Sequence, residues 1–138
     1  MDRTAPRRGY ARTFGWIWGI AYLAVALLEL LTMNNGLQVG GTDILRFGAL
    51  HNGIHWATGI ALIGSAMAGE GAARLVCRII GVAFVAVVIW NFISPDSYAR
   101  FVGMGDDLPV SYILVHIITA LGALFAGFAG PATDRDRT

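Results

Sequence analysis

Four long apolar stretches run along this chain, separated by shorter polar segments. They cover about residues 14–32, 47–68, 75–93 and 109–129. Each is close to the about 20 mostly apolar residues that a helix needs to cross the hydrocarbon core of a bilayer. The run from Val82 to Ile89 has no polar side chain, whereas a helix of a soluble bundle would carry them regularly on one face. The pattern predicts an all-α, integral membrane four-helix bundle over residues 14–130, with tails at 1–13 and 131–138.

Arginine placement predicts the orientation, because cytoplasmic segments carry an excess of basic residues. The arginines concentrate in the two tails and in the link between the second and third stretches: Arg3, Arg7, Arg8, Arg12, Arg74, Arg78, Arg135 and Arg137. The other two loops have one arginine near each, and the later one also holds Asp96, Asp106 and Asp107. We therefore expect a multi-pass protein of the bacterial inner membrane, with both termini in the cytoplasm and the two longer loops outside.

Composition agrees with this pattern and excludes other classes. Only 14% of the residues are charged and 56% are hydrophobic, against about 25% charged in an ordinary soluble domain. The net charge of +1 is not gathered on a basic face, so nucleic-acid binding is not expected. The single cysteine, Cys77, cannot form an intramolecular disulfide. The bilayer is thus the first expected partner.

The two halves of the chain resemble each other. Gly19–Leu30 aligns with Gly81–Phe92 at an offset of 62 residues, with a glycine, two alanines and a valine in common. His55-Trp-Ala-Thr aligns with His116-Ile-Ile-Thr at an offset of 61. Chance likeness between helices rich in Ala, Gly and Val is the alternative, but His and Thr are rare in spans. The pattern predicts a tandem repeat of a two-helix unit, with a pseudo-two-fold axis along the membrane normal.

The acidic, histidine and asparagine residues inside the stretches all lie toward the ends expected outside: Glu29, His51, Asn52, His55, Asn91 and His116. Ionisable groups cost free energy in a bilayer, so they commonly mark a functional site or a paired network. At about 1.5 Å per residue, each histidine lies within roughly 12 Å of its expected outer end. We therefore expect one polar layer in the outer half of the bundle.

Three interpretations of this layer stay open. His51 and His55 are four residues apart and share a helix face, so with His116 they are candidate ligands of a metal or haem iron. Glu29 would then be a further ligand, a proton acceptor or the partner that fixes a histidine tautomer. A substrate or proton route is the second interpretation. The third, which the sequence favours, is a structural hydrogen-bond network without a cofactor.

Small residues and the lack of catalytic motifs complete the picture. Gly15 and Gly19 form a Gly-x-x-x-Gly face, which allows close helix approach within the bundle or across an oligomer. The sequence shows no nucleophile with a neighbouring base, no phosphate-binding loop and no dinucleotide fingerprint. Enzyme activity is therefore not the expectation.

One segment resembles a known family. Phe47-Gly-Ala-Leu-His51-Asn-Gly-Ile-His55, followed by Gly59, resembles the second span of the bacterial family catalogued as domain of unknown function 4383. Leu114-Val115-His116 is similar to its second histidine motif, and the likeness covers about residues 14–130. The resemblance implies a small four-span membrane protein and no particular activity. The family often has an Asp four residues before the last histidine, where this chain has Tyr112, so the partner of His116 would differ here.

These observations favour an accessory or structural membrane subunit, either a homo-oligomer or part of a larger complex. A haem- or metal-binding redox protein that uses the same histidines is the alternative. A small proton-linked transporter, formed by an oligomer, is the third hypothesis.

Overall fold

The computed structural model describes residues 9–32, 37–39, 42–45, 48–103 and 110–128. In chain order these form α1 (Tyr10–Leu31), β1 (Leu37–Val39), β2 (Thr42–Leu45), α2 (Ala49–Ala68), α3 (Glu70–Ile93), α4 (Pro95–Val102) and α5 (Val110–Phe128). The all-α prediction is confirmed, with one short antiparallel strand pair as the exception. The tail at 131–138 and residues 1–8 lie outside the described residues.

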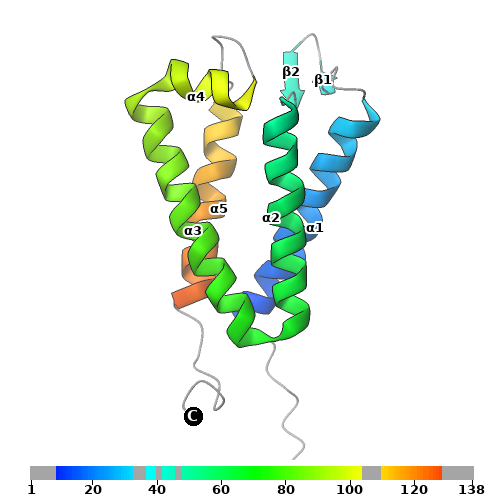
Figure 1. Cartoon of the computed structure of the whole chain (residues 1–138), viewed down its shortest axis with the longest axis vertical. Coiled ribbons are helices and arrows are strands. Elements are labelled where there is room, and N and C mark those ends of the chain that lie inside the picture. The colour runs from blue at the N-terminus through cyan, green and yellow to red at the C-terminus, as the bar shows by residue number, and fades with distance from the viewer. Residues whose placement is uncertain (1–8, 33–36, 40–41, 46–47, 104–109, 129–138) are drawn as a thin grey trace, which may run out of the picture.

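Four long helices, α1, α2, α3 and α5, run side by side (Figure 1). The strands and α4 lie at one end of these helices, and the turn between α2 and α3 lies at the other. That turn is a single residue, Gly69, whose φ of 129° is accessible to glycine and costly for other residues. We call the two ends the loop end and the Gly69 end.

Three of the four predicted spans coincide with helices that are long and apolar enough to cross a membrane: α1, α3 and α5. The fourth, predicted at 47–68, coincides with the 20-residue helix α2. Polar residues interrupt α2 and lower its mean hydropathy: His51, Asn52, His55, Thr58 and Ser65. Within the described residues, apolarity alone therefore identifies three membrane-crossing helices, and α2 needs a separate argument.

Two helices begin earlier than the apolar pattern indicates. α1 starts at Tyr10 rather than about 14, and α3 starts at Glu70 rather than about 75. The reason is that hydropathy marks the thickness of the bilayer, whereas the helix ends where its backbone hydrogen bonds end. Polar residues such as Arg12 and Arg74 extend the helices beyond the apolar stretch.

Glycines bring the helices together in two close pairs. A Cβ added to Gly19 of α1 would lie 2.7 Å from Ile63 Cγ1 and 3.1 Å from the Gly59 carbonyl of α2. A Cβ on Gly81 of α3 would lie 2.8 Å from the side chain of Leu124 in α5. Gly15 lies equally close to α2, 2.9 Å from the Leu62 carbonyl by the same measure. The Gly-x-x-x-Gly face of α1 thus lies against α2 of the same chain.

A carboxylate from α3 caps α1 at the Gly69 end. The backbone N–H groups of Ala11 and Arg12 donate to Glu70 over 3.2 and 3.0 Å, and Arg74 Nε donates to the same carboxylate over 3.3 Å. Negative charge at a helix N-terminus stabilises the free N–H groups of the first turn. This interaction joins residues 59 positions apart in the sequence and was not predicted from it.

Candidate functional site

The predicted polar residues all lie at the loop end and are all buried. Glu29 and Asn91 are close to the last residues of α1 and α3, and the three histidines lie in the first two turns of α2 and α5. Each polar residue of the predicted layer keeps 8% or less of its surface exposed. The structure brings His51, His55 and His116 around one cavity, whereas Glu29, Asn52 and Asn91 are not among the residues that line it.

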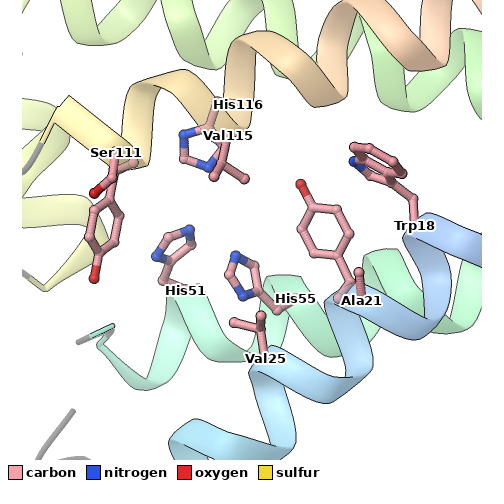
Figure 2. Close-up of a pocket in the computed structure, with 10 residues that line it drawn as sticks. Trp18, Ala21, Val25, His51, His55, Ser111, Val115 and His116 are labelled. Atoms are coloured by element: carbon pink, nitrogen blue, oxygen red, sulfur yellow. The ribbon is translucent and has the colours of Figure 1, made fainter. Parts of the chain in front are cut away.

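The histidine rings pack against one another across two helices. In α2, the ring centroids of His51 and His55 are 4.6 Å apart, and the His51 centroid is 5.9 Å from that of His116 in α5. Figure 2 shows the two α2 histidines facing the α5 histidine across the cavity. The i, i+4 spacing and the opposing helix thus produce the cluster that the sequence predicted.

Each member of the pair His55 and His116 also contacts an aromatic ring from the neighbouring helix. Tyr22 of α1 lies edge-on to His55, with centroids 5.1 Å apart. Phe84 of α3 lies 5.3 Å from His116. The histidines are therefore enclosed by rings on the side facing the core.

The hydrogen-bond partner of His116 is Tyr98, which the sequence analysis did not identify. Tyr98 Oη lies 3.1 Å from His116 Nδ1. Tyr98 belongs to α4, outside the long helices, and burial raises its pKa to about 12, so its hydroxyl stays protonated at neutral pH. When this hydroxyl donates to Nδ1, the neutral imidazole carries its proton on Nε2.

A sequence signal for α4 existed in the predicted outer loop. Pro95 occupies the first turn with Asp96 beside it, and Gly103 ends the helix with a φ of 74°. The backbone N–H of Gly48, just before α2, donates to the Val102 carbonyl over 2.8 Å. This bond fixes the end of α4 against the start of α2. Tyr98 is thereby held next to His116.

Thr119 joins α1 and α5 below the histidines. Trp18 Nε1 donates to Thr119 Oγ1 over 3.0 Å, and Tyr22 Oη donates to the same oxygen over 3.1 Å. Tyr112 is buried one helical turn before His116. It packs with Tyr98 and Val102 under α4.

The cavity has a volume of about 290 Å³. The described residues that line it come from three helices: Trp18, Ala21, Tyr22 and Val25 of α1, His51 and His55 of α2, and Ser111, Tyr112, Val115 and His116 of α5 (Figure 2). Three of these residues, Ala21, Ser111 and Val115, are exposed on the outer surface of the helices. The mouth of the cavity therefore lies between α1 and α5.

The metal hypothesis finds no complete ligand set here. In the described part of the chain, no three His, Cys, Asp or Glu side chains are placed to hold one metal ion. Cys77, the one cysteine of the sequence, is buried at the Gly69 end and makes a long contact of 3.9 Å to the Ala11 carbonyl.

Comparison with known proteins finds one family. A family model described as Domain of unknown function (DUF4383) matches residues 40–129, a range that includes α2, α3, α4, α5 and all three histidines. No curated protein and no solved structure matches the chain. The resemblance expected from the histidine segments is confirmed.

Proposed function

Since this chain belongs to the family of domain of unknown function 4383, a description that names no activity, we propose a role from its geometry. It is a small structural or accessory subunit that crosses the bacterial inner membrane four times. Its polar cluster holds two helix pairs together. The observation that carries the proposal is the surface of α2.

The polar residues of α2 all lie on the inside, and its exposed surface is free of them. Its polar residues, His51, Asn52, His55, Thr58 and Ser65, are all buried. Its exposed residues are all apolar or glycine: Ala49, Leu50, Gly53, Ala57, Ile60, Ala61, Gly64, Met67 and Ala68. A helix exposed to water would carry polar residues on its outer surface. A helix exposed to lipid carries apolar residues there, as α2 does. With 20 residues at about 1.5 Å each, α2 also matches the roughly 30 Å hydrocarbon core.

Reporter fusions test the four-span topology. Alkaline phosphatase, active outside the membrane, and green fluorescent protein, fluorescent inside, are fused after residues in the β1–β2 region, at Gly69, after Gly103 and at the C-terminus. Four spans with cytoplasmic termini predict phosphatase activity only at the first and third sites. If α2 does not cross, the C-terminus and the N-terminus fall on opposite sides, and the proposal is wrong.

The helix pairs support the tandem repeat. All seven buried residues that α5 has in the described chain correspond, at an offset of 61, to buried residues of α2. At an offset of 62, buried Ala11, Gly19, Tyr22 and Glu29 of α1 correspond to buried Ala73, Gly81, Phe84 and Asn91 of α3. The same buried positions in both pairs favour a repeat over chance likeness in composition.

Contacts repeat as well as burial. The close approach of Gly19 to Ile63 corresponds to that of Gly81 to Leu124. The contact of Tyr22 with His55, with centroids 5.1 Å apart, corresponds to that of Phe84 with His116 at 5.3 Å. We therefore propose two copies of one two-helix unit, each with a glycine contact and an aromatic–histidine contact.

In this role the polar residues form hydrogen bonds between helices whose other contacts with one another are mainly apolar. Thr119 binds two side chains of α1, and His116 binds Tyr98 of α4. Hydrogen bonds between membrane helices contribute about 0.6 kcal/mol on average and about 1–2 at most. Several such bonds together specify which helices pair, without requiring a cofactor.

The subunit role is tested on the intact chain. A tagged protein, extracted in mild detergent and analysed by native electrophoresis with light scattering, is expected to migrate as an oligomer or complex of fixed mass. A monomer that carries stoichiometric haem or metal, seen by visible absorption and elemental analysis, would overturn the structural role in favour of the redox alternative.

A further inference from the structure

The structural role leaves the cavity between α1 and α5 unexplained. We propose that this cavity binds the ring of an uncharged, lipid-soluble carbonyl compound of the quinone class, which enters from the bilayer between Ala21 and Val115. This site goes beyond the structural role, although it requires α1 and α5 to lie in the membrane.

The mouth of the cavity faces the region that lipid would occupy. At the Gly69 end, α1 and α5 touch: the rings of Tyr10 and Phe125 are 5.9 Å apart, and Phe14 lies against Gly122. The bond from Trp18 to Thr119 closes the space above them. From Trp18 and Thr119 toward the loop end, exposed residues of α1 and α5 border the opening. Val115, one of them, keeps 54% of its surface exposed. A ligand dissolved in the bilayer therefore reaches the cavity sideways.

The volume of the cavity restricts the ligand to a headgroup. A space of about 290 Å³ is at the lower end of the roughly 300–1,000 Å³ found for small-molecule sites. It accommodates one substituted ring but no long acyl chain. An isoprenoid or alkyl tail would remain outside the mouth, among the lipids.

The lining favours a flat, uncharged ring. Trp18, Tyr22 and Tyr112 supply aromatic surfaces, and the histidines supply three more rings. Aromatic rings pack favourably in stacked or edge-on arrangements. Among the residues that the structure describes, no Arg, Lys, Asp or Glu lines the cavity, so an ionised headgroup would find no counter-charge among them.

A hydrogen-bond donor is positioned for a carbonyl oxygen. Tyr98 occupies Nδ1 of His116 from outside the cavity. With the proton on Nε2, the ring presents an N–H donor to the ligand. The hydroxyl of Ser111, near the mouth, provides a second donor. Carbonyl oxygens accept such bonds, and a quinone carries two of them on opposite sides of its ring.

Tryptophan fluorescence measures the binding directly, because quinones quench it and Trp18 lines the cavity. The purified chain in lipid nanodiscs is titrated with decyl-ubiquinone, and with decylbenzene, which has the same tail but no carbonyl. Saturable quenching is expected with the quinone, and the benzene should compete at least about tenfold more weakly. Trp18→Phe removes most of the quenching, whereas Trp16→Phe, on the exposed face, retains it. Equal competition by decylbenzene would leave only an apolar crevice and overturn the proposal.

Two neighbouring substitutions on α5 locate the site. Val115→Trp fills the mouth and is expected to weaken quinone binding at least about tenfold. Leu114→Trp adds the same ring at an equally exposed position that does not line the cavity, and should bind like the wild type. Both changes are on the outer surface, so both variants are expected to fold. Unchanged binding by the Val115 variant would show that the quinone binds elsewhere.

A substitution of His116 distinguishes a site that binds a carbonyl group from a purely apolar pocket. His116→Phe keeps a ring but removes the donor, and is expected to weaken the quinone about tenfold while leaving decylbenzene unchanged. A parallel loss for both compounds would contradict the hydrogen bond. The topology fusions are independent of these titrations, so a failed site and a failed four-span arrangement give different results.

Discussion

The two ends of the long helices are filled in opposite ways. At the Gly69 end the core consists largely of small residues, and Ala11, Ala73 and Ala123 are fully buried between the helices. At the loop end, imidazole and phenol rings fill the interior and leave a cavity of about 290 Å³. Small residues let backbones approach closely, whereas rigid rings keep them apart and leave gaps between their edges. The comparison suggests a stable base at one end and a binding region at the other.

The polar groups differ between the ends as well. At the Gly69 end they are charged and bind backbone groups: Glu70 caps α1, Arg12 Nε donates to the Ala66 carbonyl, and Arg78 Nε donates to the Gly127 carbonyl, each arginine over 2.9 Å. At the loop end, side chains beside the cavity bind one another: Tyr22 pairs with Thr119, and Tyr98 pairs with His116. Charges at the first end hold the helix termini together, and neutral groups at the second remain suited to a neutral ligand.

The largest expected effect comes from adding a side chain at the close helix contact. Gly81→Leu would force its Cβ within 3.0 Å of the Leu124 backbone nitrogen, so we expect a loss of about 3 kcal/mol in unfolding free energy. Gly64→Leu is the matched control, because nothing lies within 4 Å of its Cβ position. Unfolding in mixed micelles measures both. Equal stability of the two variants would contradict the close pairing of α3 with α5.

Removal of the α1 cap is expected to have the next largest effect. Glu70→Ala deletes the acceptor of two backbone N–H groups and of Arg74, which should cost about 1–2 kcal/mol. Glu70→Gln keeps an acceptor oxygen without the charge and should recover part of that loss. Hydrogen exchange at Ala11 and Arg12 is the specific readout. Unchanged exchange in the alanine variant would exclude the cap.

A smaller effect is expected at the loop end. Tyr98→Phe removes one hydrogen bond from His116 and should reduce stability by about 1 kcal/mol or less. Its diagnostic result is spectroscopic: nitrogen NMR of the His116 ring should show the proton fixed on Nε2 in the wild type and distributed over both nitrogens in the variant. A ring with its proton on Nδ1 in the wild type would contradict the assigned donor.

The smallest effect is expected from metal removal. No three ligating side chains of the described residues are placed around one ion, so a strong chelator should leave the unfolding temperature unchanged. The unfolding temperature of His51→Phe, measured with and without the chelator, is the control, because a nonspecific effect of the chelator on the detergent would also appear in this variant. A clear fall in unfolding temperature that zinc reverses would restore the metal hypothesis.

Much of the helical arrangement was predictable from the apolar pattern. Each of the four stretches forms a helix, because about 20 apolar residues in succession favour that structure. The common level of Glu29, His51, Asn91 and His116 was predictable too, because antiparallel helices place these positions at the same end. The Glu70 cap was not, since it depends on how closely α1 and α3 approach at the Gly69 end.

The hydrogen-bond partner of His116 shows most clearly what could not be predicted from the sequence. The sequence identified Tyr112 as the residue in the place of an Asp, but proximity along a helix does not decide which group meets a ring nitrogen. Tyr98 reaches that nitrogen from a short helix that is 18 residues away in the sequence. The bond between Gly48 and Val102, together with the packing of Tyr98 and Val102 against Tyr112, places that helix over α2 and α5.

The sequence by itself determined that this chain is helical and apolar, that it belongs to its family, and that its histidines share one level. These properties follow from local composition and from spacing along each helix. The tertiary structure alone decided that the histidines surround a cavity, that Tyr98 fixes one of them, and that the mouth lies between α1 and α5. These depend on the distances between helices, which are set by the contacts of Gly19 and Gly81 near the middle of their helices and by the buried alanines toward the Gly69 end.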